Sequence, residues 1–123
     1  MTLNSAIADE FDTWDDQRNA TAKKALATEK TAAVLVAEQE VKNLFGDDTA
    51  DTDVLAVKAG FLRAVAWLRN FASMKVDSDD ERYLGAIEKW VNNEFKRRKQ
   101  RDETIYQKKV DDSSISSLFP FRT

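Results

Sequence analysis

The spacing of apolar residues predicts a central helix over Val54 to Met74. At 100° per residue, six apolar side chains fall on one face of this helix and five more flank that face. The face holds Val54, Val57, Phe61, Val65, Leu68 and Ala72, and its flanks hold Leu55, Leu62, Trp67, Phe71 and Met74. Only a narrow strip remains for water, with Ala59, Arg63 and Asn70. Apolar cover on nearly every side indicates a helix that is packed from several directions.

A shorter amphipathic helix is predicted at the N-terminus, where four apolar residues follow one another at spacings of four, four and three. These residues are Leu3, Ile7, Phe11 and Trp14. We expect their common face to dock on the core of the same chain. The alternative is an interface with a neighbouring subunit or a partner protein. The polar residues that follow predict a break between Asp15 and Asn19, with Asn19 or Thr21 capping the next helix.

An alanine-rich helix is predicted to run to about Phe45, where Gly46 would supply a left-handed cap. An acidic loop then leads to Thr52 or Asp53 as the N-cap of the central helix. The clustered carboxylates of this loop raise the alternative of a calcium site. The ordered spacing and terminal glutamate of an EF-hand are missing, so we favour a solvated turn with helix caps and expect no metal. The carboxylates belong to Asp47, Asp48, Asp51 and Asp53.

The last helix is predicted to start at the capping box Ser78-Asp79-Asp80-Glu81. Its core face holds Leu84, Ile87, Val91 and Phe95, joined by Tyr83 and Trp90. From Lys96 to Thr104 there is no apolar side chain and no helix breaker. We therefore expect the helix to continue past the edge of the core, from Asp79 to about Val110, a length of ~48 Å at 1.5 Å per residue.

The segment after this helix is predicted to be an extended arm. It contains Pro120 and four serines, which oppose helix, together with apolar residues that are too few for a core. We expect these residues to dock on another subunit or partner, and the alternative is a terminal segment without fixed structure. The apolar residues of the arm are Ile115, Leu118, Phe119 and Phe121.

Composition supports an all-α fold, a small bundle of three to four helices with a long C-terminal helix and an extended C-terminal arm. The 123 residues include one proline and three glycines, and this scarcity of breakers favours helix over strand. The length fits one domain, which we assign to residues 1–110, with the arm at 111–123.

Cysteine and histidine are both absent, which excludes disulfides, thiolate catalysis, Cys/His zinc sites and any mechanism that needs imidazole. No glycine-rich phosphate loop, nucleophile elbow or metal-ligand spacing is found in the sequence. We therefore expect no enzyme and no cofactor. The N-terminus lacks the basic and apolar regions of a signal peptide, and no apolar run approaches the ~20 residues of a membrane span. We expect a soluble protein that is made inside the cell and has no membrane partner.

Charge is divided unequally along the chain. Residues 1–53 hold 12 acids and 5 bases, a net charge of −7, and residues 54–123 hold 10 acids and 14 bases, a net charge of +4. Such segregation can orient subunits head to tail or present one basic face to nucleic acid. The strongest basic feature is a run of five cations within six residues, Lys96, Arg97, Arg98, Lys99 and Arg101. We favour ion pairs within the helix or between subunits for this run, with nucleic-acid contact as the alternative.

Together these features describe a subunit of an assembly, because a small bundle cannot bury this much aromatic surface alone. In its core around Val54 to Met74, its Asp79 to Val110 helix and its Ser113 to Thr123 arm, the chain resembles the head-tail adaptor (connector) proteins of tailed bacteriophages. These are small helical proteins that form a ring beneath the portal. The resemblance implies a structural virion protein in a dodecameric ring, made in the host cytoplasm. It also implies that the arm and long helix contact the portal, tail or neighbouring subunits, with DNA passing through the lumen.

Two other functions remain open from the sequence. One is a nucleic-acid-associated packaging or regulatory protein of a phage, which would use the run from Lys96 to Arg101. The other is a small helical inhibitor that docks on a host protein through the face of the N-terminal helix.

Overall fold

The computed structural model describes residues 1–18 and 25–106, with side chains up to residue 101. Within these ranges it contains four α-helices and no strand. The helices are α1 (Leu3–Asp16), α2 (Ala27–Phe45), α3 (Val54–Phe71) and α4 (Ser78–Tyr106). The all-α fold and the long last helix are confirmed. The predicted arm lies outside the described residues.

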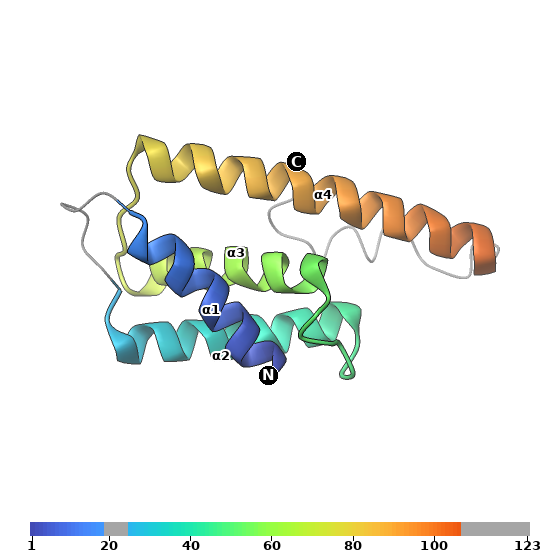
Figure 1. The fold of residues 1–123 in the computed structure, drawn as a ribbon, viewed down its shortest axis with the longest axis horizontal. Helices are drawn as coiled ribbons and strands as arrows, with labels where there is room; N and C mark the ends of the chain where they lie inside the picture. Colours follow the sequence, from blue (N-terminus) through green and yellow to red (C-terminus); the bar gives the residue numbers. More distant parts are fainter. Residues whose placement is uncertain (19–24, 107–123) are drawn as a thin grey trace.

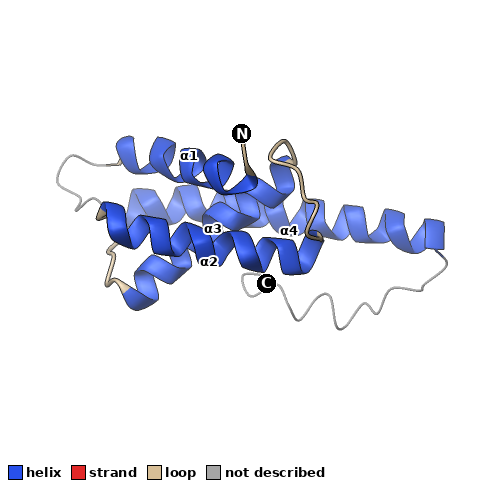
Figure 2. Cartoon of the chain, turned by 90° about the horizontal axis from the view of Figure 1, so that it is seen from below, coloured by secondary structure: helices blue, strands red, loops and turns tan. Residues whose placement is uncertain are grey.

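Helix α3 is the centre of the bundle and packs against each of the other three helices. Figures 1 and 2 show α2 and α4 on opposite sides of α3, with α1 crossing a third side. Ten of the 18 residues of α3 are buried. The predicted central helix is therefore confirmed, and all three of its neighbours come from the same chain.

The ends of α3 differ from the prediction. The helix stops at Phe71 rather than Met74, because Ser73 adopts a positive φ of 55° and turns the chain away. Val54 and Phe71, both expected to be covered, are 56% and 73% exposed, since they lie in the first and last positions of the helix. Ala59 was expected in the polar strip but is buried at 2% exposure.

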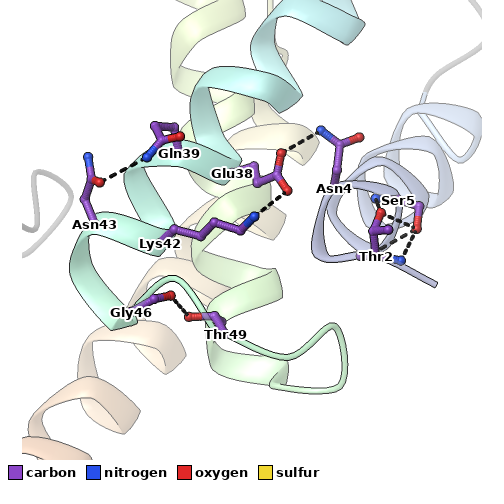
Figure 3. Close-up of polar contacts among 9 residues, drawn as sticks. All are labelled: Thr2, Asn4, Ser5, Glu38, Gln39, Lys42, Asn43, Gly46 and Thr49. Atoms are coloured by element: carbon purple, nitrogen blue, oxygen red, sulfur yellow. Dashed lines mark hydrogen bonds and ion pairs between the residues drawn. The ribbon is translucent and has the colours of Figure 1, made fainter.

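Polar contacts hold α1 at its start and along its length. A capping box joins Thr2 and Ser5, with each side chain accepting the backbone N–H of the other residue, and Asn4 donates to Glu38 of α2 at 3.1 Å (Figure 3). The helix ends at Asp16, within the predicted break. Along its length, Lys30 of α2 forms an ion pair with Asp12 at 2.7 Å.

Both ends of α2 differ from the caps that were predicted for them. The helix starts at Ala27 after Leu26, which makes no side-chain capping bond, so neither Asn19 nor Thr21 is its N-cap. Gly46 ends the helix with φ 115° and ψ 153°. The positive φ explains the glycine, but this conformation is not the predicted left-handed helical one. The carbonyl of Gly46 accepts the Thr49 hydroxyl at 2.6 Å, which closes the turn (Figure 3).

The capping box of α4 lies one residue earlier than predicted. Asp77 rather than Ser78 accepts a backbone N–H, from Asp80 at 2.8 Å, and Asp80 accepts the Asp77 N–H at 3.1 Å. Both serine and aspartate make good N-caps, and each of the two has an acidic residue three positions on, so the sequence pattern fits either residue as the cap. The 29 residues of α4 extend for about 43 Å at 1.5 Å per residue. Its C-terminal part projects beyond α2 and α3 (Figure 1).

Candidate interaction surfaces

The apolar face of α1 belongs to the core of its own chain. Leu3, Ile7, Phe11 and Trp14 are all buried there. The rings of Phe11 and Trp14 both lie against Phe61 of α3, at centroid distances of 6.4 Å and 5.6 Å. The expectation of core docking is confirmed. The alternative, in which these four residues form a partner interface, is wrong because α3 already occupies the face.

A buried ionic cluster joins the end of α1 to the start of α4. The side chain of Arg18 is only 2% exposed, and its guanidinium donates to Asp15 at 3.2 Å and to Asp80 at 3.1 Å. It also donates to the carbonyl of Lys75 and lies over the ring of Trp14, 4.8 Å from the centroid. Because 62 residues separate Arg18 from Asp80, no local sequence pattern pointed to this cluster.

A hollow of about 350 Å³ lies beside this cluster, where the end of α1 meets the start of α4. Its lining mixes aromatic and charged residues, namely Trp14, Gln17, Arg18, Asp77, Asp79, Asp80 and Tyr83. The charged groups of the lining have partners: Arg18 pairs with Asp80, and Asp79 pairs with Arg82 at 3.3 Å. The carboxylates of Asp77 and Asp80 each accept the backbone N–H of the other residue. These contacts hold the end of α1 against the start of α4, which is a structural role.

The basic run of α4 does not act as one unit. Arg98 binds both carboxylate oxygens of Asp53, at 2.9 Å and 3.1 Å, and lies 5.7 Å from the centroid of the Phe45 ring. Asp53 also caps α3 by accepting the N–H of Ala56 at 3.3 Å. Arg98 thus fixes α4 to the start of α3 and the end of α2. The Asp53 cap was predicted, and its ion pair with Arg98 was not.

Two carboxyl groups near α4 have shifted pKa values. Burial alone would raise the pKa of Asp53, but hydrogen bonds from Arg98 and from the N–H groups of Ala56 and Leu55, with the charge of Arg98, lower it. Burial raises the pKa of Glu88. The Asp53 carboxylate is therefore held ionised, as expected for a structural ion pair.

Of the other cations of α4, five are exposed and Lys99 is half-buried. Arg82, Lys89, Lys96, Arg97 and Arg101 are all exposed. Arg82 pairs with Asp79, and Arg97 with Glu94 at 2.8 Å. Lys89 and Lys96 have no ion pair within residues 1–18 and 25–101. At 100° per residue, Lys89 and Lys96 lie on the side of the helix opposite the core residue Val91.

Several large apolar side chains remain on the surface. Trp67 and Phe71 form a pair at the end of α3, with ring centroids 5.3 Å apart, and Phe71 is largely exposed. Trp90 of α4 is 41% exposed, and both Leu26, just before α2, and Leu35 of α2 are more than half exposed. Exposed aromatic residues of this size are enriched where proteins contact one another.

The predicted contacts of the arm, Ile115, Leu118, Phe119 and Phe121, lie outside the described residues. Among the residues that the structure describes, no group of three acidic side chains is arranged to hold a metal ion, and this includes the described part of the loop around Asp47. None of the described helices is long and apolar enough to cross a membrane.

Comparisons with known proteins give no match. No family model matches the chain, and neither the curated proteins nor the solved structures contain a significant match. The surfaces described above are therefore the basis for any functional inference.

Proposed function

We propose that this protein is a structural subunit of a larger protein assembly, of the kind formed by the head-tail adaptors of tailed bacteriophages. The observation that carries the proposal is the projection of α4 beyond the rest of the bundle (Figure 1). Arg98 contacts the core of its own chain through Asp53 and Phe45, and the helix continues from there to Tyr106. Isolated helical turns are marginal in water, so a partner surface for this extension would stabilise it.

The exposed aromatic residues support the same proposal. Within the described ranges the bundle already provides α3 with three neighbours, yet Phe71 remains 73% exposed beside Trp67. An aromatic side chain that contributes little to its own core has a natural role as an anchor for a neighbouring subunit. In the proposed ring, this pair and the α4 extension would contact adjacent subunits or the portal and tail proteins.

The finer parts of the proposal follow from the adaptor resemblance. They are a closed dodecameric ring, its location in the virion, and a central passage for DNA. A ring needs two different surfaces on each subunit, so that the same contact repeats around an axis. We propose a structural role for the chain and no catalytic one.

Light scattering of the purified chain tests the proposal, first alone and then mixed with a candidate portal protein. We expect a discrete assembly of several subunits in at least one of these conditions. A strict monomer at every concentration, alone and in the mixture, would defeat the proposal. The variant Phe71→Ser should weaken assembly, because it removes an exposed anchor while leaving the core of the monomer intact.

A further inference from the structure

Helices α1 and α4 carry complementary charge patterns on their outward sides. On α4, Lys89, Asn93 and Lys96 follow one another at spacings of four and three residues, and all three are exposed. On α1, Asp9, Thr13 and Asp16 have the same spacing and are also exposed. At 100° per residue, positions seven apart return to within about 20° of each other, so each pattern forms one narrow stripe.

The two stripes have the same length and opposite charge. The two charges of each stripe are separated by about 10.5 Å along the helix axis, at 1.5 Å per residue. A small polar residue lies between them in both helices, so two such helices can approach without a bulky side chain in the way. The carboxylates of Asp9 and Asp16, like the ammonium groups of Lys89 and Lys96, have no ion pair among the described residues.

These stripes cannot meet within one chain. The α4 stripe lies opposite the core residues Leu84 and Val91, and the α1 stripe lies opposite Ile7 and Phe11. Each stripe therefore points away from the bundle, and Figure 1 shows α1 and α4 on different sides of α3. A contact between them requires two molecules.

We propose that the basic stripe of α4 (Lys89, Asn93 and Lys96) docks on the acidic stripe of α1 (Asp9, Thr13 and Asp16) of a second copy of this chain. The inference rests on the proposed function and names the surfaces through which neighbouring subunits would meet. Because the two stripes occupy different sides of the molecule, the contact is heterologous and repeats from copy to copy, as a ring requires.

The ion pairs set the orientation of neighbouring subunits more than the strength of their association. Exposed pairs contribute about 0.2–1 kcal/mol each and weaken as salt screens them. Trp90, which is 41% exposed and flanks the basic stripe, would add apolar contact at its edge. Like charges facing each other are repelled, so reversing one stripe should oppose association and reversing both should restore it.

Charge reversal provides the test, with the full chain and with light scattering as the measurement. The basic-stripe variant carries Lys89→Glu and Lys96→Glu, and the acidic-stripe variant carries Asp9→Lys and Asp16→Lys. A control with the same change of charge as the acidic-stripe variant carries Asp47→Lys and Asp48→Lys, at two exposed residues of the loop between α2 and α3. Circular dichroism verifies that each variant keeps its helices.

We expect each stripe variant alone to associate about tenfold more weakly than the original chain, or worse. Mixing the two variants should restore assembly, because every contact in an alternating complex then joins opposite charges. A single chain with all four changes should also assemble, and the loop control should behave like the original chain.

Assembly of either stripe variant at the original strength would overturn the inference, as would loss of assembly in the loop control or failure of the mixed variants to associate. If the basic-stripe variant assembles normally but loses retention on DNA, the stripe is a nucleic-acid surface and the inference is also wrong. Failure of the proposed function gives a different result, since the original chain would then remain monomeric in every condition.

Discussion

The contact between α1 and α3 depends on a glycine, and replacing that glycine tests whether α1 belongs to the core of its own chain. A methyl group added at Gly60 would lie 2.7 Å from Cγ1 of Ile7, with the Cδ1 atom of Ile7 also in its way. Ile7 is fully buried, so its side chain has little room to move. The variant Gly60→Ala should therefore force α1 and α3 apart.

Gly85 of α4 provides a matched control, because a methyl group there would meet no atom within 4 Å. In a helix interior, alanine is favoured over glycine by about 1 kcal/mol, so Gly85→Ala should stabilise the protein by up to that amount. Gly60→Ala receives the same benefit but adds an overpacking cost of about 1–3 kcal/mol. The two variants should differ by about the overpacking cost, with Gly60→Ala the less stable.

Urea unfolding followed by circular dichroism measures both free energies under conditions where the chain is monomeric. Adding Ile7→Val to Gly60→Ala removes the Cδ1 atom and should recover part of the lost stability, although Ile7→Val alone costs about 0.5–1.5 kcal/mol. Equal stability of Gly60→Ala and Gly85→Ala would refute the close contact between α1 and α3. It would also reopen the interpretation in which α1 docks on another subunit.

Three further predictions concern the other structural contacts. Arg18→Met should lower the free energy of unfolding by about 3 kcal/mol or more, because it leaves the buried carboxylates of Asp15 and Asp80 without this cation. In the same urea experiment, Lys30→Met at a surface pair should cost less than about 1 kcal/mol. Because the pKa of Asp53 is lowered in the folded state, its ion pair stabilises the protein above the ordinary carboxyl pKa, and this benefit is lost as pH falls below that value and through the lowered pKa of the folded state. Asp53→Asn should therefore flatten the loss of stability as pH falls below about 5, and an unchanged slope would contradict this reasoning. Phe71→Ser should change the stability of the monomer by no more than about 0.5 kcal/mol, as expected for an exposed residue, and calorimetry under monomeric conditions checks this.

Periodic patterns predicted the parts of the fold that depend on burial. The central helix and the apolar face of α1 were expected from the spacing of apolar residues, because that spacing determines which side of a helix can be buried. The continuation of α4 past its core was expected because residues 96–104 contain no helix breaker. The patterns did not determine how much of the length of a helix its neighbouring helices cover. Phe71 matches the apolar pattern of α3 but lies at its last turn, where it remains exposed.

Contacts between distant residues could not be predicted from local patterns. Arg98 is one of five cations in a run, and only the fold brings it to Asp53, 45 residues earlier. The same holds for Arg18 and Asp80, which are joined because the end of α1 meets the start of α4. The N-cap of α4 is Asp77 rather than the predicted Ser78 for a different, local reason: the two adjacent residues were both suited to the role. The basic run therefore contains both a structural arginine, Arg98, and exposed cations such as Lys96 and Arg97.

The mass of the complex purified from its native source tests most directly whether this chain is a subunit of an assembly. We predict a discrete complex containing several copies of the chain, with a mass that falls toward that of the monomer as salt is raised. A single copy of 14.0 kDa at every salt concentration, with no associated protein, would contradict the proposed role.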